Sequence, residues 1–398
     1  MDFTPALPTN NNGEIFSELL VLAEQVSINS AKLTATHNVH ILNALRELLR
    51  KVNSYYSNKI ESEGTHPIDI ERAMRNDFDD DEKKRNLQKL SLVYIEVQRE
   101  IEKKSSEEDF NPFSKAFILK VHELLYAKPE MESFLKIKKE KGSTETVTMK
   151  AGRLREQNVA ISRHVAPNFS ELETLFNHYE SYYKLYPYFT QAKKVVYALA
   201  SHHRLTWLHP FLDGNGRTSR LVLDGIFSHI ELEGYGLWNL SRGLARNDKG
   251  YREYLSQADM VRQGDLDGRG VLSTKGLMIY VQFMLKTALD QIEFMNRHLR
   301  LDLLTTRMEK FIRLSQEGFF EQEALPKYSE LLLKELLIKG ELPRGKVKEV
   351  IGTKDRTASA LIKKLLELDY VESTTSKSAI RLKFNSFFAS YLFPDLMP

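Results

Sequence analysis

Residues 209–220, HPFLDGNGRTSR, bring together residue types that could perform chemistry on phosphate groups. Two glycines flank Asn215, and glycine lets the backbone adopt left-handed conformations and approach a ligand closely. At a helix start, free N–H groups and the helix dipole favour the binding of an anion. The sequence therefore predicts an anion-binding turn at residues 214–216, followed by a helix.

Charged side chains surround this turn at spacings that suit a polyphosphate. Arg217 and Arg220 lie three residues apart, so both face one side of the expected helix, and guanidinium groups bind phosphate oxygens in pairs. Asp213 precedes the turn, and a carboxylate beside a polyphosphate commonly holds Mg²⁺. His209 is a candidate general base, since histidine titrates near neutral pH. We therefore expect a triphosphate site with a base beside it.

Other classes of site fit the sequence less well. No Walker A motif is present, and an EF-hand loop starting at Asp213 would find Arg217 and Asp224 at two of its ligand positions. The chain has no cysteine, which excludes disulfides and cysteine-based zinc sites. The net charge of +3, from 57 basic and 54 acidic residues, is too balanced to predict bulk attraction to nucleic acid or membranes.

The elements that must position these residues are predicted to be helices. Residues 195–209 have a helical pattern that Pro210 must end, and residues 217–230 form a second helical pattern with Val222, Ile226 and Ile230 on one face. Similar patterns cover residues 14–52, 87–101 and most of 170–304, whereas the first dozen residues are expected to be loose. Residues 135–162 alternate and contain Gly142 and Gly152, which predicts a small hairpin.

The last ninety residues resemble a winged helix, an α+β domain with residues 353–369 as its recognition-type helix. Four basic side chains on that helix could meet phosphates: Lys354, Arg356, Lys363 and Lys364. Asp355 and Glu367 dilute the positive charge there. Winged helices bind DNA or dock to proteins, so both kinds of partner stay open.

Residues 209–220 also resemble the signature of Fic domains, H-x-F-x-D/E-G-N-G-R-x-x-R, at every defined position. The resemblance implies a mainly α fold, a Fic-type helical bundle with a small β-hairpin flap. It also implies transfer of AMP from ATP to a Ser, Thr or Tyr hydroxyl of a target protein, with release of pyrophosphate. His209 would be the base, Asp213 would hold Mg²⁺, and Gly214, Asn215 and Gly216 would form the anion hole. Arg217 and Arg220 would bind phosphates further out.

Two further segments resemble parts of Fic proteins that bind substrates. Residues 152–162, GRLREQNVAIS, are similar to the segment before the flap, a hairpin that docks the backbone of the target protein as an added strand. Residues 237–255 are similar to the region that closes over adenine, which implies that Asn247 and Tyr251 contact the nucleotide.

Residues 57–64, SNKIESEG, resemble the inhibitory helix of the family, S/T-x-x-x-E-G/N. Ser57 and Glu61 fit this pattern, with Ser62 where the family has Gly or Asn. A register on Glu63 would place Lys59 at the Ser position, so we prefer Glu61. The resemblance implies that the Glu61 carboxylate pairs with Arg220 and restrains ATP binding. In some family members the same glutamate supports the removal of AMP.

The expected organisation has four parts. Residues 1–110 form a helical region with the inhibitory helix, 111–265 the Fic core, 266–310 a helical connector and 311–398 the winged helix. The N-terminus is not a signal peptide and no apolar run approaches the ~18–20 residues of a membrane span, so we expect a cytoplasmic protein without a membrane partner.

The leading functional hypothesis is therefore a protein adenylyltransferase that uses ATP and Mg²⁺ and is inhibited by Glu61. Three alternatives stay open: a DNA-binding regulator whose Fic core senses a nucleotide, a Fic transferase with another nucleotide donor, and an enzyme that removes AMP. The identity of the target protein and whether the chain forms a homo-oligomer also stay open.

Overall fold

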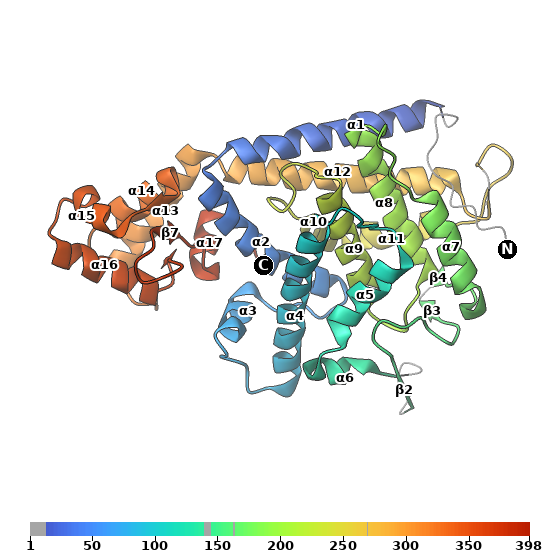
Figure 1. The fold of residues 1–398 in the computed structure, drawn as a ribbon, viewed down its shortest axis with the longest axis horizontal. Coiled ribbons are helices and arrows are strands. Elements are labelled where there is room, and N and C mark those ends of the chain that lie inside the picture. Colours follow the sequence, from blue (N-terminus) through green and yellow to red (C-terminus); the bar gives the residue numbers. More distant parts are fainter. Residues whose placement is uncertain (1–12, 139–144, 162–163, 269) are drawn as a thin grey trace.

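The computed structural model describes residues 13–138, 145–161, 164–268 and 270–398. Within them the chain is mainly helical, which confirms the expected fold class (Figure 1). The first dozen residues, Gly142 and Ser162, about which the sequence made predictions, lie outside the described residues. In the described part of the chain, no helix combines the length and the apolar character that a membrane span requires.

A larger helical body contains the first twelve α-helices. They are α1 (Gly13–Lys32), α2 (Val39–Ile60), α3 (Pro67–Met74), α4 (Glu82–Lys104), α5 (Lys115–Tyr126), α6 (Glu132–Leu135), α7 (Leu172–Tyr182), α8 (Gln191–Leu208), α9 (Asn215–His229), α10 (Leu240–Arg246), α11 (Asp248–Ala258) and α12 (Thr274–His298). The long α12 lies along α1 and also packs against α8, α10 and α11 (Figure 1). The expected connector at residues 266–310 thus contains a helix of this body, while the domain boundaries stay predictions.

Helix α9 lies among helices that arrive from distant parts of the sequence. Helices α8, α4 and α5 pack against it, and its apolar side chains Val222 and Ile226 are buried. Asn38 directly precedes helix α2 and caps it, since its side chain accepts from the His40 N–H. Its apolar residues at helical spacing, among them Leu45, are buried as well. Both helices are therefore fixed parts of the core.

In the described residues, the strands of the larger body form two small hairpins, the first of which lies within residues 135–162, where a hairpin was expected. Strand β1 (Lys136–Lys138) pairs with β2 (Thr146–Thr148), and β3 (Ala160–Ile161) pairs with β4 (His164–Val165), both antiparallel. The expected flap segment, residues 152–162, is mostly loop and reaches only the first strand of the second hairpin. Alternation in the sequence indicated strands here but could not show which strands pair.

The C-terminal unit forms the other end of the molecule, drawn in orange and red in Figure 1. Its helices are α13 (Leu301–Gln316), α14 (Ser329–Lys339), α15 (Val347–Val350), α16 (Asp355–Glu367) and α17 (Ser386–Leu392). Its strands β5 (Glu341–Leu342), β6 (Val371–Glu372) and β7 (Ile380–Leu382) form an antiparallel sheet in the order β5-β7-β6. The sequence indicated only two of these strands, and the name winged helix stays a prediction.

The end of the chain packs back onto the larger body. The carbonyl of Asp395 accepts from Arg242 Nη2 on α10 at 2.6 Å, and that of Leu396 accepts from the Tyr56 hydroxyl on α2 at 3.3 Å. At the start of α17, the Ser386 N–H donates to the Glu71 carboxylate on α3 at 2.8 Å. The C-terminal unit is therefore joined to the same two helices, α2 and α3, that flank the predicted inhibitory segment.

Candidate active site

His209 lies at a sharp corner after α8. Its backbone is left-handed, with φ 45° and ψ 59°, and Pro210 prevents the helix from continuing. Arg155 holds this corner, since its Nε donates to the His209 carbonyl at 2.8 Å and its Nη2 donates to the Pro167 carbonyl at 2.6 Å. The buried ring of Phe211 stacks on His122 with centroids 3.8 Å apart, which anchors the following loop in the core.

The surroundings of His209 keep its imidazole neutral. Burial lowers the pKa of His209 to about 3, and the positive charges of His164 and Arg155 act in the same direction. A neutral imidazole can accept a proton, which a general base requires. The negative charge of a bound polyphosphate would raise this pKa toward the working range.

The turn after Asp213 opens the N-terminus of α9 to a ligand. Gly214 has φ 75°, and a Cβ at this position would overlap the ring of Tyr126, so only glycine fits. No side chain caps α9. The Asn215 side chain shapes the loop, because it accepts from the Phe211 N–H at 2.9 Å and donates to the Phe211 carbonyl at 2.8 Å. The N-terminus of α9 therefore retains the character of an anion site.

Both signature arginines are buried and face helix α2. Arg217 donates to the Asn58 side chain at 2.9 Å and to the Tyr126 hydroxyl at 3.0 Å. Arg220 donates to the Ser57 hydroxyl at 2.8 Å and to the Ser57 carbonyl at 2.9 Å. These contacts hold the two guanidinium groups in fixed orientations before any ligand arrives.

The two glutamates that follow α2 each form an ion pair with one of these arginines. Arg220 Nη2 lies 2.7 Å from Glu61 Oε1, and Arg217 forms an ion pair with Glu63. Burial alone would raise the pKa of Glu61, but the charges of Arg220 and Arg217 outweigh it and lower the pKa. Glu61 is therefore ionised at neutral pH.

The Glu61 carboxylate also lies directly over the anion-binding turn. A Cβ added to Gly216 would overlap Glu61 Oε1, so this oxygen fills the space beside the first residues of α9. A phosphate bound at the helix start would need the same space. Glu61 therefore pairs with Arg220 and also fills part of the volume that an anion would need.

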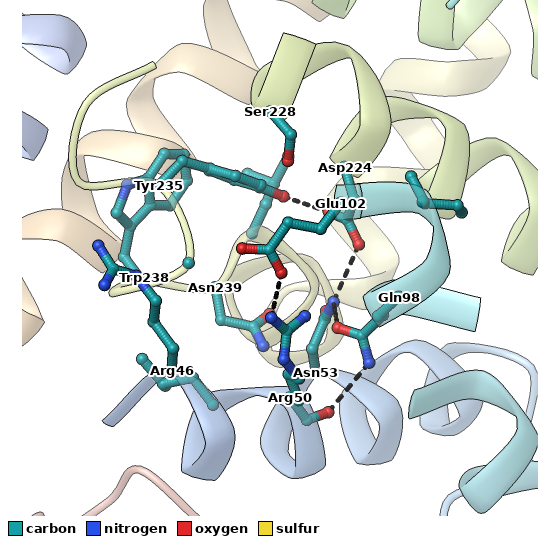
Figure 2. A pocket seen from close by; sticks show the side chains of 14 residues that line it. Arg46, Arg50, Asn53, Gln98, Glu102, Asp224, Ser228, Tyr235, Trp238 and Asn239 are labelled. Atoms are coloured by element: carbon teal, nitrogen blue, oxygen red, sulfur yellow. Dashed lines mark hydrogen bonds and ion pairs between the residues drawn. The ribbon is translucent and has the colours of Figure 1, made fainter. Parts of the chain in front are cut away.

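Further polar contacts fix α2 against α9 one turn away from Arg220 (Figure 2). The Asp224 carboxylate accepts from the Asn53 amide at 3.1 Å and from the Tyr235 hydroxyl. Burial raises the pKa of Asp224 to about 6, although these two bonds oppose the shift. Arg50 and Glu102 pair on the wall of a small cavity of about 70 Å³ beside them. This network fixes the register between α2 and α9, and with it the position of Ser57.

A cavity of about 620 Å³ opens next to these groups. Five of the residues predicted from the sequence line it: Glu61, His209, Gly216, Arg220 and Tyr251. The rest of its wall comes mainly from α11 and the end of α8, with apolar side chains such as Leu255 and Met260. Its size falls within the range of small-molecule sites, about 300–1,000 Å³.

The two residues expected to contact adenine differ in position. Tyr251 is buried at the cavity, and its hydroxyl lies 3.1 Å from His202 Nε2. Because His202 Nδ1 faces the Ser219 carbonyl at 3.1 Å, Nδ1 carries the proton and Tyr251 donates to Nε2. Asn247 is exposed and does not line the cavity, since its side chain caps α11 by accepting from the Gly250 N–H. A nucleotide contact of Asn247 stays a prediction.

Asp213 lies at the solvent-exposed edge of the turn, and its Oδ1 accepts from the Gly214 N–H at 2.6 Å. Among the described residues, no group of three or more His, Asp or Glu side chains could hold a metal ion by itself. One carboxylate still fits Mg²⁺, which usually keeps several waters and binds through one or two carboxylates and substrate phosphates. Mg²⁺ at Asp213 stays a prediction.

Several residues that shape this site have no direct signal in the sequence. Tyr126, Asn58 and Glu63 contact Arg217 from sequence separations of 91, 159 and 154 residues. Arg155 falls within the segment that resembles the flap region, which was the only indication of a role for it. His164 lines the cavity beside His209 and follows that segment.

Comparison with known proteins connects this geometry to a family. The sequence model of the Fic/DOC family matches residues 112–226. "Protein adenylyltransferase Fic" of Aedes aegypti is 40% identical over 76 residues, which cover 19% of this chain and 15% of that protein. The protein of the same name from Nematostella vectensis is 33% identical over 117 residues, which cover 28% and 24%. The chain thus matches no more than about a quarter of the length of either relative.

Two solved structures share the fold at low sequence identity. A Fic family protein from Desulfovibrio desulfuricans G20 aligns with a TM-score of 0.50 and 16% identity, over 91% of this chain and 96% of that chain. A Fic domain containing signaling protein from Bacteroides thetaiotaomicron VPI-5482 gives 0.53 and 14%, over 69% and 95%. These likenesses concern the fold alone. The family match covers most of α9 and the turn before it, so this chain carries a Fic/DOC domain in residues 112–226.

Proposed function

We propose that this protein transfers AMP from ATP to a hydroxyl group of a target protein and that Glu61 restrains the reaction. The observation that carries the proposal is the cavity of about 620 Å³ that His209, Gly216 and Arg220 share. It offers a neutral base, an uncapped helix N-terminus and a buried guanidinium group in one place. The curated relatives named protein adenylyltransferase support the same reaction class.

In the proposed step, the oxygen of the target hydroxyl attacks the α-phosphorus of ATP. A new bond forms between this oxygen and phosphorus, while the bond from phosphorus to the oxygen that bridges to the β-phosphate breaks. Pyrophosphate leaves with that electron pair, and His209 takes the hydroxyl proton. The pKa of about 3 keeps His209 unprotonated before substrate binds. The protein contributes mainly position and charge, as is usual for reactions at phosphorus.

The phosphates would lie over the start of α9. The N–H groups at residues 215–217 and the helix dipole favour an anion there, and Arg217 and Arg220 can neutralise its outer oxygens. Asp213 would hold Mg²⁺, which would supply positive charge to offset the charge of the phosphates. The base of the nucleotide would lie along α11, near Tyr251 and the apolar Leu255.

Glu61 would act as an internal competitor of the phosphates. Its carboxylate contacts Arg220 at 2.7 Å and covers the space beside Gly216. Arg252 on α11 supports this position, since its Nη2 donates to the Ile60 carbonyl at 2.7 Å, directly before Glu61. ATP could then bind with all its phosphates in place only after Glu61 has moved.

The experiment that tests the proposal uses the Glu61→Gly chain with ATP labelled either at the α- or at the γ-phosphate, Mg²⁺ and a cell lysate. We expect label on protein from the α-position alone and no labelling when His209→Ala is added. Label from the γ-position would instead indicate a kinase. Transfer that survives His209→Ala would refute the role of the histidine.

Two alternatives have separate tests in the same assay. If UTP or CTP reduces the labelling from ATP, the protein accepts another nucleotide donor, because the contacts to the phosphates do not distinguish between nucleotide bases. Loss of AMP from prelabelled protein in the presence of the wild-type chain, and not of Glu61→Gly, would reveal removal of AMP.

The role of the C-terminal unit is proposed to be docking to protein. On α16, Lys364 pairs with Glu323 and Glu367, and Lys363 also pairs with Glu367, so half of the basic residues considered for DNA contacts are already partnered. DNA binding would show as a salt-dependent mobility shift of a duplex, and we expect none.

A further inference from the structure

The cavity contains a second histidine whose contacts differ from those of His209. His164 lies on β4, the second strand of the β3–β4 hairpin, and its ring centroid is 6.1 Å from that of His209. His164 Nδ1 lies 3.1 Å from Oδ2 of Asp259, the residue that follows α11. His164 Nε2 lies 3.0 Å from the carbonyl of Trp207, near the end of α8. One side chain thus joins the hairpin to both helices that wall the cavity.

Both partners of His164 present oxygen atoms to its ring. A backbone carbonyl oxygen can only accept a hydrogen bond, and so can an ionised carboxylate. Burial opposes ionisation of Asp259, but bonds from His164 and His203 hold its pKa well below the usual range. Each ring nitrogen of His164 thus faces an acceptor oxygen, so a side chain with two separate donors fits this position.

The side chains next to Asp259 hold its carboxylate in place. His203 accepts from Arg204 Nη1 through Nδ1 at 3.0 Å and faces Asp259 Oδ1 through Nε2 at 3.2 Å, which is the pattern of a neutral histidine. Arg204 is fully buried. Asp259 therefore faces His164 through Oδ2 and His203 through Oδ1, and Arg204 orients His203. Other charged side chains also line the cavity, namely Glu61, Arg220, Lys249, Arg252 and Glu253.

The β3–β4 hairpin needs such an attachment. It consists of two residue pairs, Ala160 with Val165 and Ile161 with His164, and an isolated two-stranded hairpin is marginal in water. The Val165 side chain is 77% exposed, so it adds little burial to hold the strand. The two bonds of His164 are the described contacts that tie β4 to the helical body at the cavity.

We propose that His164 is a positioning residue that holds the β3–β4 hairpin at a fixed distance from His209, so that an extended segment of the target protein presents its hydroxyl to the base. This inference rests on the proposed transfer reaction. A peptide added to a strand edge gains affinity from main-chain bonds, and its register then decides which side chain reaches the cavity. A displaced hairpin would misplace the hydroxyl without disturbing the nucleotide.

The test compares two substitutions in the Glu61→Gly chain. His164→Gln can donate to Asp259 but cannot also donate to the Trp207 carbonyl, whereas His164→Arg has several donors and can bond to both. We expect His164→Gln to lower the transfer of α-labelled AMP to lysate proteins about tenfold, as for one lost hydrogen bond. The Kd for ATP should change less than about twofold. His164→Arg should recover most of the transfer.

Three outcomes would overturn the proposal. They are unchanged transfer in His164→Gln, a parallel loss of transfer and ATP affinity, and a failure of His164→Arg to exceed His164→Gln when both melt at the wild-type temperature. Amide hydrogen exchange in residues 160–165 of the nucleotide-free chain gives a reading independent of activity. If Glu61→Gly itself transfers no label, the proposed reaction fails. In that case, faster exchange in His164→Gln supports the attachment of the hairpin, and unchanged exchange refutes it.

Discussion

The structure allows an estimate of how much the removal of the Glu61 carboxylate should change the rate of AMP transfer. In the wild-type chain, Glu61 Oε1 accepts from Arg220 Nη2 at 2.7 Å in a largely buried setting and covers Gly216. A hydrogen bond to a charged group contributes about 1.5–3 kcal/mol, which corresponds to a factor of about 10 to 150 in the equilibrium between an occupied and a free Arg220. We therefore expect Glu61→Gly to raise the rate of AMP transfer by about 10- to 150-fold.

Glu63 provides a matched control for this prediction. It lies two residues further along, forms an ion pair with Arg217 and does not line the cavity. Its side chain is 35% exposed, close to the 31% of Glu61, so the two glutamates differ mainly in what they cover. Glu63→Gly removes the same charge and adds the same backbone freedom, but it leaves Glu61 over Gly216. We therefore expect a smaller rise in transfer than for Glu61→Gly.

The assay is the initial rate of label incorporation from α-labelled ATP into lysate proteins, measured at equal concentrations of wild type and both variants. Binding of a non-hydrolysable ATP analogue by calorimetry shows whether affinity follows the rate. Equal rates for Glu61→Gly and wild type would refute the competition between Glu61 and phosphate. A Glu63→Gly rate as high as that of Glu61→Gly would refute the specific geometry, since loss of one charge near the arginines would then suffice.

Three further predictions address the turn and the α2–α9 interface. Gly214→Ala should cost about 1–3 kcal/mol in stability and abolish ATP binding, because φ 75° and the Tyr126 ring exclude a side chain; unchanged melting would contradict this. Burial raises the pKa of Asp224 to about 6, so ionisation of Asp224 lowers the stability of the wild type as pH rises from about 4 to 6, whereas Asp224→Asn lacks this loss. The difference in unfolding free energy should therefore grow by up to about 3 kcal/mol in favour of the variant. A constant difference from about pH 4 to 7 would contradict the pKa shift. Chelation of divalent ions, or Asp213→Ala, should stop AMP transfer, and transfer that persists under chelation would remove Mg²⁺ from the proposal.

Local signals in the sequence were enough to predict the helices around the turn. Pro210 had to end one helix, Gly214 permitted the left-handed turn, and the apolar spacing that includes Val222 and Ile226 indicated the next helix. The pairing of Glu61 with Arg220 followed from a resemblance, and the structure brings these two residues together across 159 positions. Most of the site residues that could be predicted from the sequence therefore belong to motifs of fixed spacing.

The remaining features depend on packing between distant segments. The sequence does not show that Tyr126 fills the space beside Gly214 or that Asp259 faces His164, because Tyr and Asp occur in many environments. The alternation in residues 135–162 indicated strands but not that β3 pairs with a strand beyond this range. Asn247 is the opposite case. Its place in the sequence indicated a contact with the nucleotide, but in the structure its side chain caps α11.

The burial of helix α2 determines how fast Glu61 can be displaced. Detaching this helix would expose Leu45, Leu49, Val52 and other core side chains at about 1.5–3 kcal/mol each, a total comparable with the stability of a whole domain, about 5–15 kcal/mol. Displacement of Glu61 is therefore confined to its own side chain and the turn after Ile60. Motions of this size take nanoseconds to microseconds, whereas a typical enzymatic turnover takes about 0.1 s. Under the proposed inhibition, Glu61 would therefore set the fraction of time for which the site is open, and every molecule would sample the open and the closed state many times within one turnover.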